Sequence, residues 1–197
     1  MSRQIVAALI LGWACGGHLL AEPDQAPWEK ITDVSPNKKF AMRILCKQEP
    51  ADPNQIDPES VTAVQLIALP SKSVVVADLG QSMEGAPPQK LFWSRDSRWF
   101  AYALSQGHRV TETSVYRQVG DKFEPLDTDE LQVPSGGDPR NQYIEPLRWL
   151  KPGTLVLEQF TIFFYGKGES TFDFTVRFDA NGKSHIVDKK RVRRKEE

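Results

Sequence analysis

Short apolar runs alternate with polar, turn-forming segments along most of this 197-residue sequence. From 172 to 178 every second residue is apolar and the residues between are polar, which is typical of a half-buried β-strand. The Asn-Gly pair at 181–182 then predicts a hairpin into residues 185–187. Similar hairpins are predicted within 61–79 and 114–126, and no segment has a sustained helical period. The pattern therefore predicts an all-β antiparallel meander.

A motif of an apolar residue, a polar turn and an apolar run occurs three times. The copies occupy residues 34–42, 93–102 and 149–157. In each, six residues separate the leading apolar position from the first apolar residue of the run, in the pairs Val34 and Phe40, Trp93 and Trp99, and Trp149 and Leu155. The spacing predicts one supersecondary unit used three times, because a single unit cannot bury its hydrophobic face alone.

The polar segment of each copy has the composition of a tight turn. Asn37 and Asp96 can bond their own backbone two residues on, and a Pro-Gly pair at 152–153 presets the third turn. Five aromatic residues beside these turns are expected to pack between sheets, because aromatic side chains dominate core burial. They are Trp93, Trp99, Phe100, Tyr102 and Trp149.

The second copy resembles a known repeat. Residues 94–102, Ser-Arg-Asp-Ser-Arg-Trp-Phe-Ala-Tyr, are similar to the Ser-Pro-Asp-Ser/Gly-Arg/Lys-Trp-Leu/Ile-Ala-Phe/Tyr repeat of TolB-like and WD40-like β-propeller proteins, and residues 35–40 are similar too. The third copy departs, with Leu150 for Ser and Gly153 where Ser97 stands. The resemblance implies a periplasmic or extracellular binding scaffold with no catalytic residues to transfer. Because closed propellers have four or more blades, three units predict an incomplete propeller, a curled or sandwiched sheet, or one part of an oligomer.

The N-terminus has the order of a secretory signal peptide. Arg3 precedes an apolar run at 5–14, and Ala21 precedes a polar stretch, so we expect residues 1–21 to be removed on export to the periplasm or the exterior. A lipoprotein anchored through Cys15 is the alternative, and we rank it second because the Leu usual three places earlier is missing. Cleavage would leave Cys46 alone, as a buried small hydrophobe without a disulfide.

Charge is segregated along the chain. Without residues 1–21 the net charge is −2, yet residues 22–188 carry −6 because 189–197 holds six basic residues and only two acidic ones. We therefore expect a single all-β repeat domain at 22–188 and a solvated, disordered tail at 189–197. This basic tail could also contact an anionic surface.

Catalytic motifs are scarce. No cofactor or metal site is expected, since the mature chain holds only His108 and His185, and the acidic residues at 127, 129 and 130 lack calcium-loop spacing. Two long loops, 48–59 and 133–146, are the candidates for binding, with Arg140 and Tyr143 as anchors in the second.

These observations favour a non-catalytic, envelope-associated binding module. Its expected partner is another protein or an envelope component and not a nucleic acid, and it could be an oligomer. A small secreted carboxylate-dependent hydrolase and an inhibitor of a secreted enzyme are the alternatives, because carboxylates distant in sequence can meet in a fold.

Overall fold

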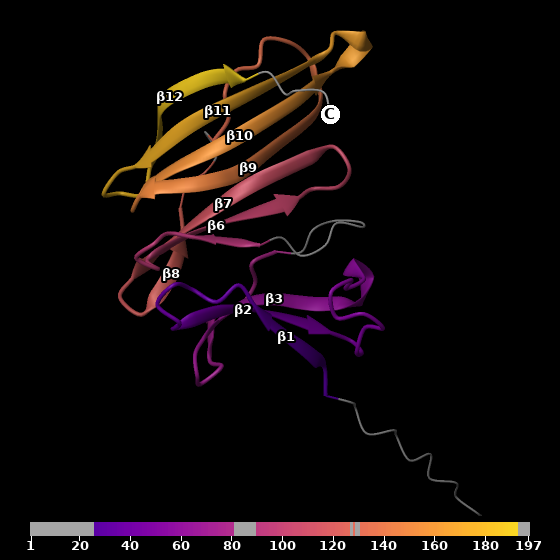
Figure 1. The fold of residues 1–197 in the computed structure, drawn as a ribbon, viewed down its shortest axis with the longest axis vertical. Helices are drawn as coiled ribbons and strands as arrows, with labels where there is room; N and C mark the ends of the chain where they lie inside the picture. The colour runs from indigo at the N-terminus through magenta and orange to yellow at the C-terminus, as the bar shows by residue number, and fades with distance from the viewer. Residues whose placement is uncertain (1–25, 81–89, 127, 129–130, 193–197) are drawn as a thin grey trace, which may run out of the picture.

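The computed structural model describes residues 26–80, 90–126, 128 and 131–192 (Figure 1). The expected signal segment 1–21, the acidic residues 127, 129 and 130 and the last five residues of the expected tail lie outside these ranges. The described chain is all-β, as predicted, with two single-turn 3-10 helices at Pro58–Ser60 and Phe164–Gly166. Neither of these helices is long and apolar enough to cross a membrane.

The strands form three consecutive four-stranded antiparallel meanders (Figure 1). The first meander contains β1 (Trp28–Thr32), β2 (Phe40–Cys46), β3 (Val61–Ala68) and β4 (Val74–Val76). The second contains β5 (Leu91–Trp93), β6 (Trp99–Ser105), β7 (Val110–Val119) and β8 (Lys122–Pro125). The third contains β9 (Pro139–Lys151), β10 (Thr154–Phe163), β11 (Glu169–Phe178) and β12 (Ser184–Val192). A short parallel pairing of β7 with β9 joins the second and third meanders into one eight-stranded sheet, and neither sheet closes into a barrel or propeller.

The three predicted hairpins are confirmed as β3–β4, β7–β8 and β11–β12. Phe174 and Val176 of β11 point into the core beside Leu157 and Leu155 of β10, while the polar residues between them point the other way. The alternation in the sequence therefore reports the two faces of the sheet.

The first two motif turns share one hydrogen-bond pattern. In the first, the Ser35 hydroxyl donates to Asn37 Oδ1 at 2.8 Å and accepts the Phe40 N–H at 3.0 Å. In the second, the Ser94 hydroxyl donates to Asp96 Oδ1 at 2.6 Å and accepts the Trp99 N–H at 3.0 Å. Each serine is buried, and its hydroxyl gives a strand N–H a hydrogen-bond partner inside the turn.

The turns match in backbone shape as well, and they touch. Lys38 and Ser97 occupy the same place in their turns, with φ of 60° and 61°. The Asn37 N–H donates to Ser97 Oγ at 2.9 Å, which joins the first turn to the second. The third turn is a tight Pro-Gly hairpin in which Gly153 has φ of 70° and Leu150 is exposed. A serine is therefore not needed there.

Two hydrophobic cores lie between the meanders. The first joins the inner faces of β2 and β3 to Phe100, Tyr102 and Phe123 of the second meander. The second core joins the opposite face of β6 and β7 to Leu155, Leu157, Phe174 and Val176 of the third meander. The second meander is buried on both faces, and the five predicted aromatic residues all pack in these cores, as expected.

Two expectations are wrong, one about a loop and one about the C-terminal tail. Residues 139–146 belong to β9 and not to a loop, although Pro139 and Pro146 favoured one. Pro139 is the first residue of the strand and Pro146 pairs with Leu157 at a register shift, and these are places where a strand tolerates proline. Likewise β12 extends to Val192, four residues into the expected tail, because β11 supplies main-chain partners for residues 189–192.

Candidate functional site

The candidate site is a cleft where β7 and β9 separate. The two strands pair in parallel only at Val110 with Gln142 and Thr111 with Tyr143. Further along, β7 pairs instead with β8, from Tyr116 onward. The edge of β7 between these two pairings faces a hollow of about 320 Å³. Strands that part in this way leave main-chain and side-chain groups without a sheet neighbour, so such a place is suited to ligands.

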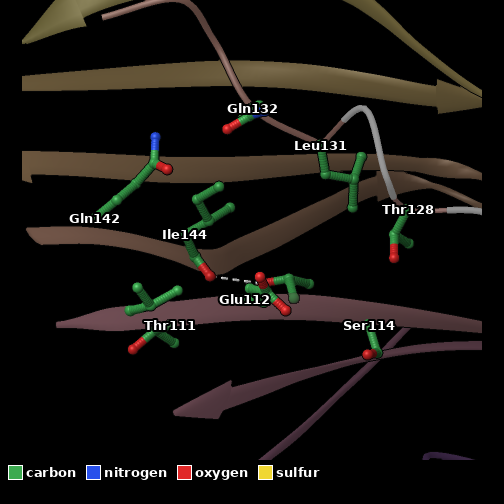
Figure 2. Close-up of a pocket in the computed structure, with 10 residues that line it drawn as sticks. Thr111, Glu112, Ser114, Thr128, Leu131, Gln132, Gln142 and Ile144 are labelled. Atoms are coloured by element: carbon green, nitrogen blue, oxygen red, sulfur yellow. Dashed lines mark hydrogen bonds between the residues drawn. The ribbon is translucent and has the colours of Figure 1, made fainter. Parts of the chain in front are cut away.

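Polar side chains dominate the lining of the cleft (Figure 2). Because the hollow lies at the edge of β7, residues from both faces of that strand reach it. The lining from β7 is Val110, Thr111, Glu112, Thr113 and Ser114, and the remaining wall consists of Gln142, Ile144, Thr128, Leu131 and Gln132. Among these residues Glu112 is the only one with an ionisable side chain, and it is exposed.

A buried hydrogen bond sets the width of the cleft at its base. Thr113 Oγ1 donates to the Ile144 carbonyl at 2.7 Å, across the point where β7 and β9 diverge (Figure 2). Thr113 and Ile144 are both buried, so the bond replaces the main-chain pairing that the strands have lost. The hydroxyl thereby keeps β9 beside β7 without closing the hollow.

One wall of the cleft is a strap, residues 131–137, that crosses the inner face of the third meander. Gln159, fully buried on β10, fixes this strap with two bonds to a single residue. Its Oε1 accepts the Val133 N–H at 2.7 Å and its Nε2 donates to the Val133 carbonyl at 2.8 Å. The side-chain amide thus acts like a neighbouring strand, and it accounts for a polar residue in the core.

A second, more open hollow of about 720 Å³ borders the same strap. Its lining comes from the strap itself and from Pro139, Gln142 and Ile186. Gln132 and Gln142 border both hollows, so these two amides can contact a ligand in either one.

The two anchors predicted from sequence lie elsewhere. Arg140 is exposed on β9 and its Nε donates to Asn141 Oδ1 at 3.0 Å. The Tyr143 hydroxyl donates to the His108 carbonyl at 3.0 Å and accepts from Asn141 Nδ2 at 2.7 Å, which ties β9 to the β6–β7 hairpin. Neither residue lines the cleft, and the predicted loop 48–59 does not reach it.

Tyr143 does border a third hollow, of about 330 Å³, on the outer face of the third meander. Its ring stacks on Phe160, with centroids 6.1 Å apart and planes 18° from parallel. Glu145 and Glu158 complete the lining, and they are direct partners across β9 and β10. Like charges directly opposite one another repel across the two strands.

The described groups with shifted acidity lie outside the cleft. Burial raises the pKa of Asp33, although its Oδ2 accepts the Leu91 N–H at 3.2 Å. The bond from His185, 3.2 Å away, is the main cause that lowers the pKa of Asp179. Among the residues that the structure describes, no three His, Cys, Asp or Glu side chains are grouped so as to hold a metal ion.

Family models, curated proteins and solved structures all lack a match to this chain. The site must therefore be interpreted from its own chemistry.

The sequence alone did not reveal the cleft, because a parallel contact between distant strands creates it. One signal was present: Leu155, Leu157, Gln159 and Thr161 share a face by their period of two, which places an amide beside core leucines.

Proposed function

We propose that the protein is an exported, non-catalytic binding module whose cleft between β7 and β9 holds an uncharged polar ligand segment. A glycan or a peptide main chain has the alternating donors and acceptors that such a site requires. The observation that carries the proposal is the lining: hydroxyl and amide groups from two strands and the strap converge on one hollow. Groups of this kind both donate and accept hydrogen bonds, and they suit orientation of a ligand better than acid–base chemistry.

The repeated architecture supports a scaffold role. The Trp93 indole donates to the Asp33 carbonyl at 2.9 Å, and the Trp149 indole donates to the Phe92 carbonyl at 2.8 Å. In both cases the tryptophan that begins one motif copy donates to the residue immediately before the first residue of the previous copy. We infer that the meanders are three related, propeller-like units in an open arrangement, and that envelope association follows from the signal-like segment 1–21.

Alanine variants of the cleft amides test the function. Purified protein is screened on glycan and peptide arrays, and each hit is titrated by calorimetry. Gln142→Ala should weaken binding about tenfold or more, since it removes donors and acceptors that border both hollows. The matched control is Gln118→Ala, on β7 but outside the cleft, where the amide donates to the exposed Gly120 carbonyl.

Gln118→Ala should leave the affinity unchanged. Equal losses in the two variants would place binding outside the cleft. Turnover of any array ligand would contradict the non-catalytic assignment.

The carboxylate-dependent hydrolase is a second candidate, because Glu145 and Glu158 face one hollow beside two stacked aromatic rings. Aromatic rings and paired carboxylates are the components of glycoside hydrolysis. The assay is release of reducing ends from glycans. Activity that Glu158→Gln abolishes while Gln142→Ala leaves it intact would favour the hydrolase over the binding module.

A further inference from the structure

The hairpin between β10 and β11 ends in an aromatic tip, residues 163–168. It contains Phe163, Phe164, Tyr165, two glycines and Lys167. Phe163 packs on the strap, where its ring would meet a side chain placed on Gly137 at 2.8 Å. The Phe164 N–H donates to the Asp138 carbonyl at 3.1 Å. The base of the tip is therefore fixed to the body of the protein.

Tyr165, at the end of the tip, is held out into solvent. Its side chain is 87% exposed, the highest value among the exposed large hydrophobic residues. Its backbone has φ of 60° and ψ of 31°, a left-handed conformation that is unfavourable for a bulky residue. A side chain added at Gly166 or Gly168 would meet no atom within 4 Å, so open space surrounds the tip. The Tyr165 ring lies beside that of Phe164, with centroids 5.8 Å apart, yet most of its surface is exposed. A large exposed ring at this strained position suggests a contact with something outside the fold.

Basic residues lie at the same end of the third meander as the tip. Lys167 belongs to it, Arg140 lies at the start of β9 beside Phe163, and the C-terminal end of β12 lies at the same end of the meander (Figure 1). There Lys190 and Arg191 lie opposite Asp173 and Phe172 of β11. Nearby acids are Asp138, Glu169 and Asp173. The four described basic residues outnumber these three acids by one, which favours an anionic surface over a cationic one.

We propose that the aromatic tip docks the protein on an anionic lipid bilayer, with Tyr165 at the headgroup level and Lys167, Lys190 and Arg191 against the lipid phosphates. Aromatic rings with a polar edge favour the membrane–water interface, and basic residues add attraction to an anionic leaflet. A protein partner would need a complementary apolar pocket for a single projecting ring. A bilayer accepts such a ring without one.

Vesicle co-sedimentation tests this proposal. The full chain is mixed with phosphatidylcholine vesicles with and without phosphatidylglycerol, at low and high ionic strength. The variants are Tyr165→Ser and Lys167→Gln. Their matched controls are Leu150→Ser and Lys151→Gln, an exposed apolar residue and a lysine near the Pro-Gly turn of the third unit, at the opposite end of the meander. All variants keep residues 1–21, so binding through that segment is common to every sample.

We expect binding that requires phosphatidylglycerol and falls with salt. Lys167→Gln should weaken it about fivefold, the contribution of one basic residue at an anionic surface. Tyr165→Ser should weaken it at least as much, while Tyr165→Gly should lose binding without loss of stability, because glycine adopts the tip conformation freely. The controls should bind as the parent protein does.

Three outcomes would overturn the proposal. The first is an absence of binding to anionic vesicles at low salt. The second is an equal loss in Leu150→Ser and Tyr165→Ser. The third is binding that depends on charge but not on Tyr165, which would assign it to the basic strand alone. None of these results bears on the cleft, so the two proposals can fail separately.

Discussion

The serine hydroxyl in each of the first two motif turns should be a measurable source of stability. Ser94→Ala deletes a buried hydroxyl that accepts the Trp99 N–H and donates to Asp96 Oδ1. The variant loses the hydrogen bond to a charged acceptor, and it leaves the part-buried Trp99 N–H without its partner. Each loss costs about 1–2 kcal/mol, and partial access of water to Asp96 reduces the sum, so we expect about 2 kcal/mol of lost stability.

The other units provide matched comparisons. Ser35→Ala should cost about 1–2 kcal/mol, because the same two bonds are lost but the acceptor is the uncharged Asn37 amide. Leu150→Ala, at the position that corresponds to the serines, should change stability by less than about 0.5 kcal/mol, since Leu150 is 55% exposed. Asp96→Asn should be nearly neutral, because the first turn already uses asparagine at this place.

Urea unfolding followed by tryptophan fluorescence measures these differences, with the slope of the transition required to stay constant. The order of loss should be Ser94→Ala, then Ser35→Ala, then Leu150→Ala. A Ser94→Ala midpoint equal to that of the parent would refute the reasoning, since the hydroxyl would then be replaceable by water. A loss for Leu150→Ala as large as that for Ser94→Ala would show that the third turn depends on its side chain too.

Three further changes test the core, an acid and the strap. Trp99→Ala should cost about 3 kcal/mol of stability, at the low end for a core aromatic residue, because the ring packs on Trp149 and Phe178 but is only partly buried. Thermal unfolding measures this loss, and an unchanged midpoint would mean that the ring is exposed. Burial raises the pKa of Asp33, so its contribution to stability is full at low pH and is lost as the pH rises through the raised value. The stability of Asp33→Asn relative to the parent should therefore increase from pH 3 to pH 7, and urea midpoints of the two proteins that shift in parallel would contradict this. Gln159→Leu leaves the Val133 N–H and carbonyl unpaired, so it should cost about 2–4 kcal/mol of stability and expose the strap to proteolysis. Gln118→Ala is the control, and a protease-resistant Gln159→Leu variant would show that the strap stays in place without the amide.

The sequence predicted the fold wherever structure follows from nearby residues. The strict alternation in β11 identified a strand and its two faces, and the turn residues marked the hairpins. The same reasoning missed residues 139–146, because a local pattern cannot show that Pro146 will sit at a register shift opposite Leu157. It also ended the domain at 188, since charge at a chain end suggests solvation and not pairing with β11.

The candidate site could not be predicted from the sequence for a related reason. The cleft exists because β9 pairs with the start of β7 while β8 occupies the end of the same edge, and these contacts join segments that are 32 residues apart at Val110 and Gln142. Tyr143 was a reasonable anchor by its residue type, but in the fold its hydroxyl donates to the β6–β7 hairpin. A residue type suggests what a side chain can do, and only the pairing of strands decides what lies within its reach.

Departures from local rules gather in one part of the molecule. Gln159 puts an amide in a hydrophobic face, Glu145 and Glu158 place like charges opposite one another, and Tyr165 holds a large ring in a left-handed conformation. All three lie on β9, on β10 or on the tip that joins β10 to β11, whereas the buried positions of the first meander are almost wholly apolar. Such departures cost stability and persist at functional sites or where a neighbour compensates for them. Gln159 has its compensation in the strap. The glutamate pair lines a hollow and Tyr165 projects into solvent, so the third meander is where ligand and surface contacts should be sought first.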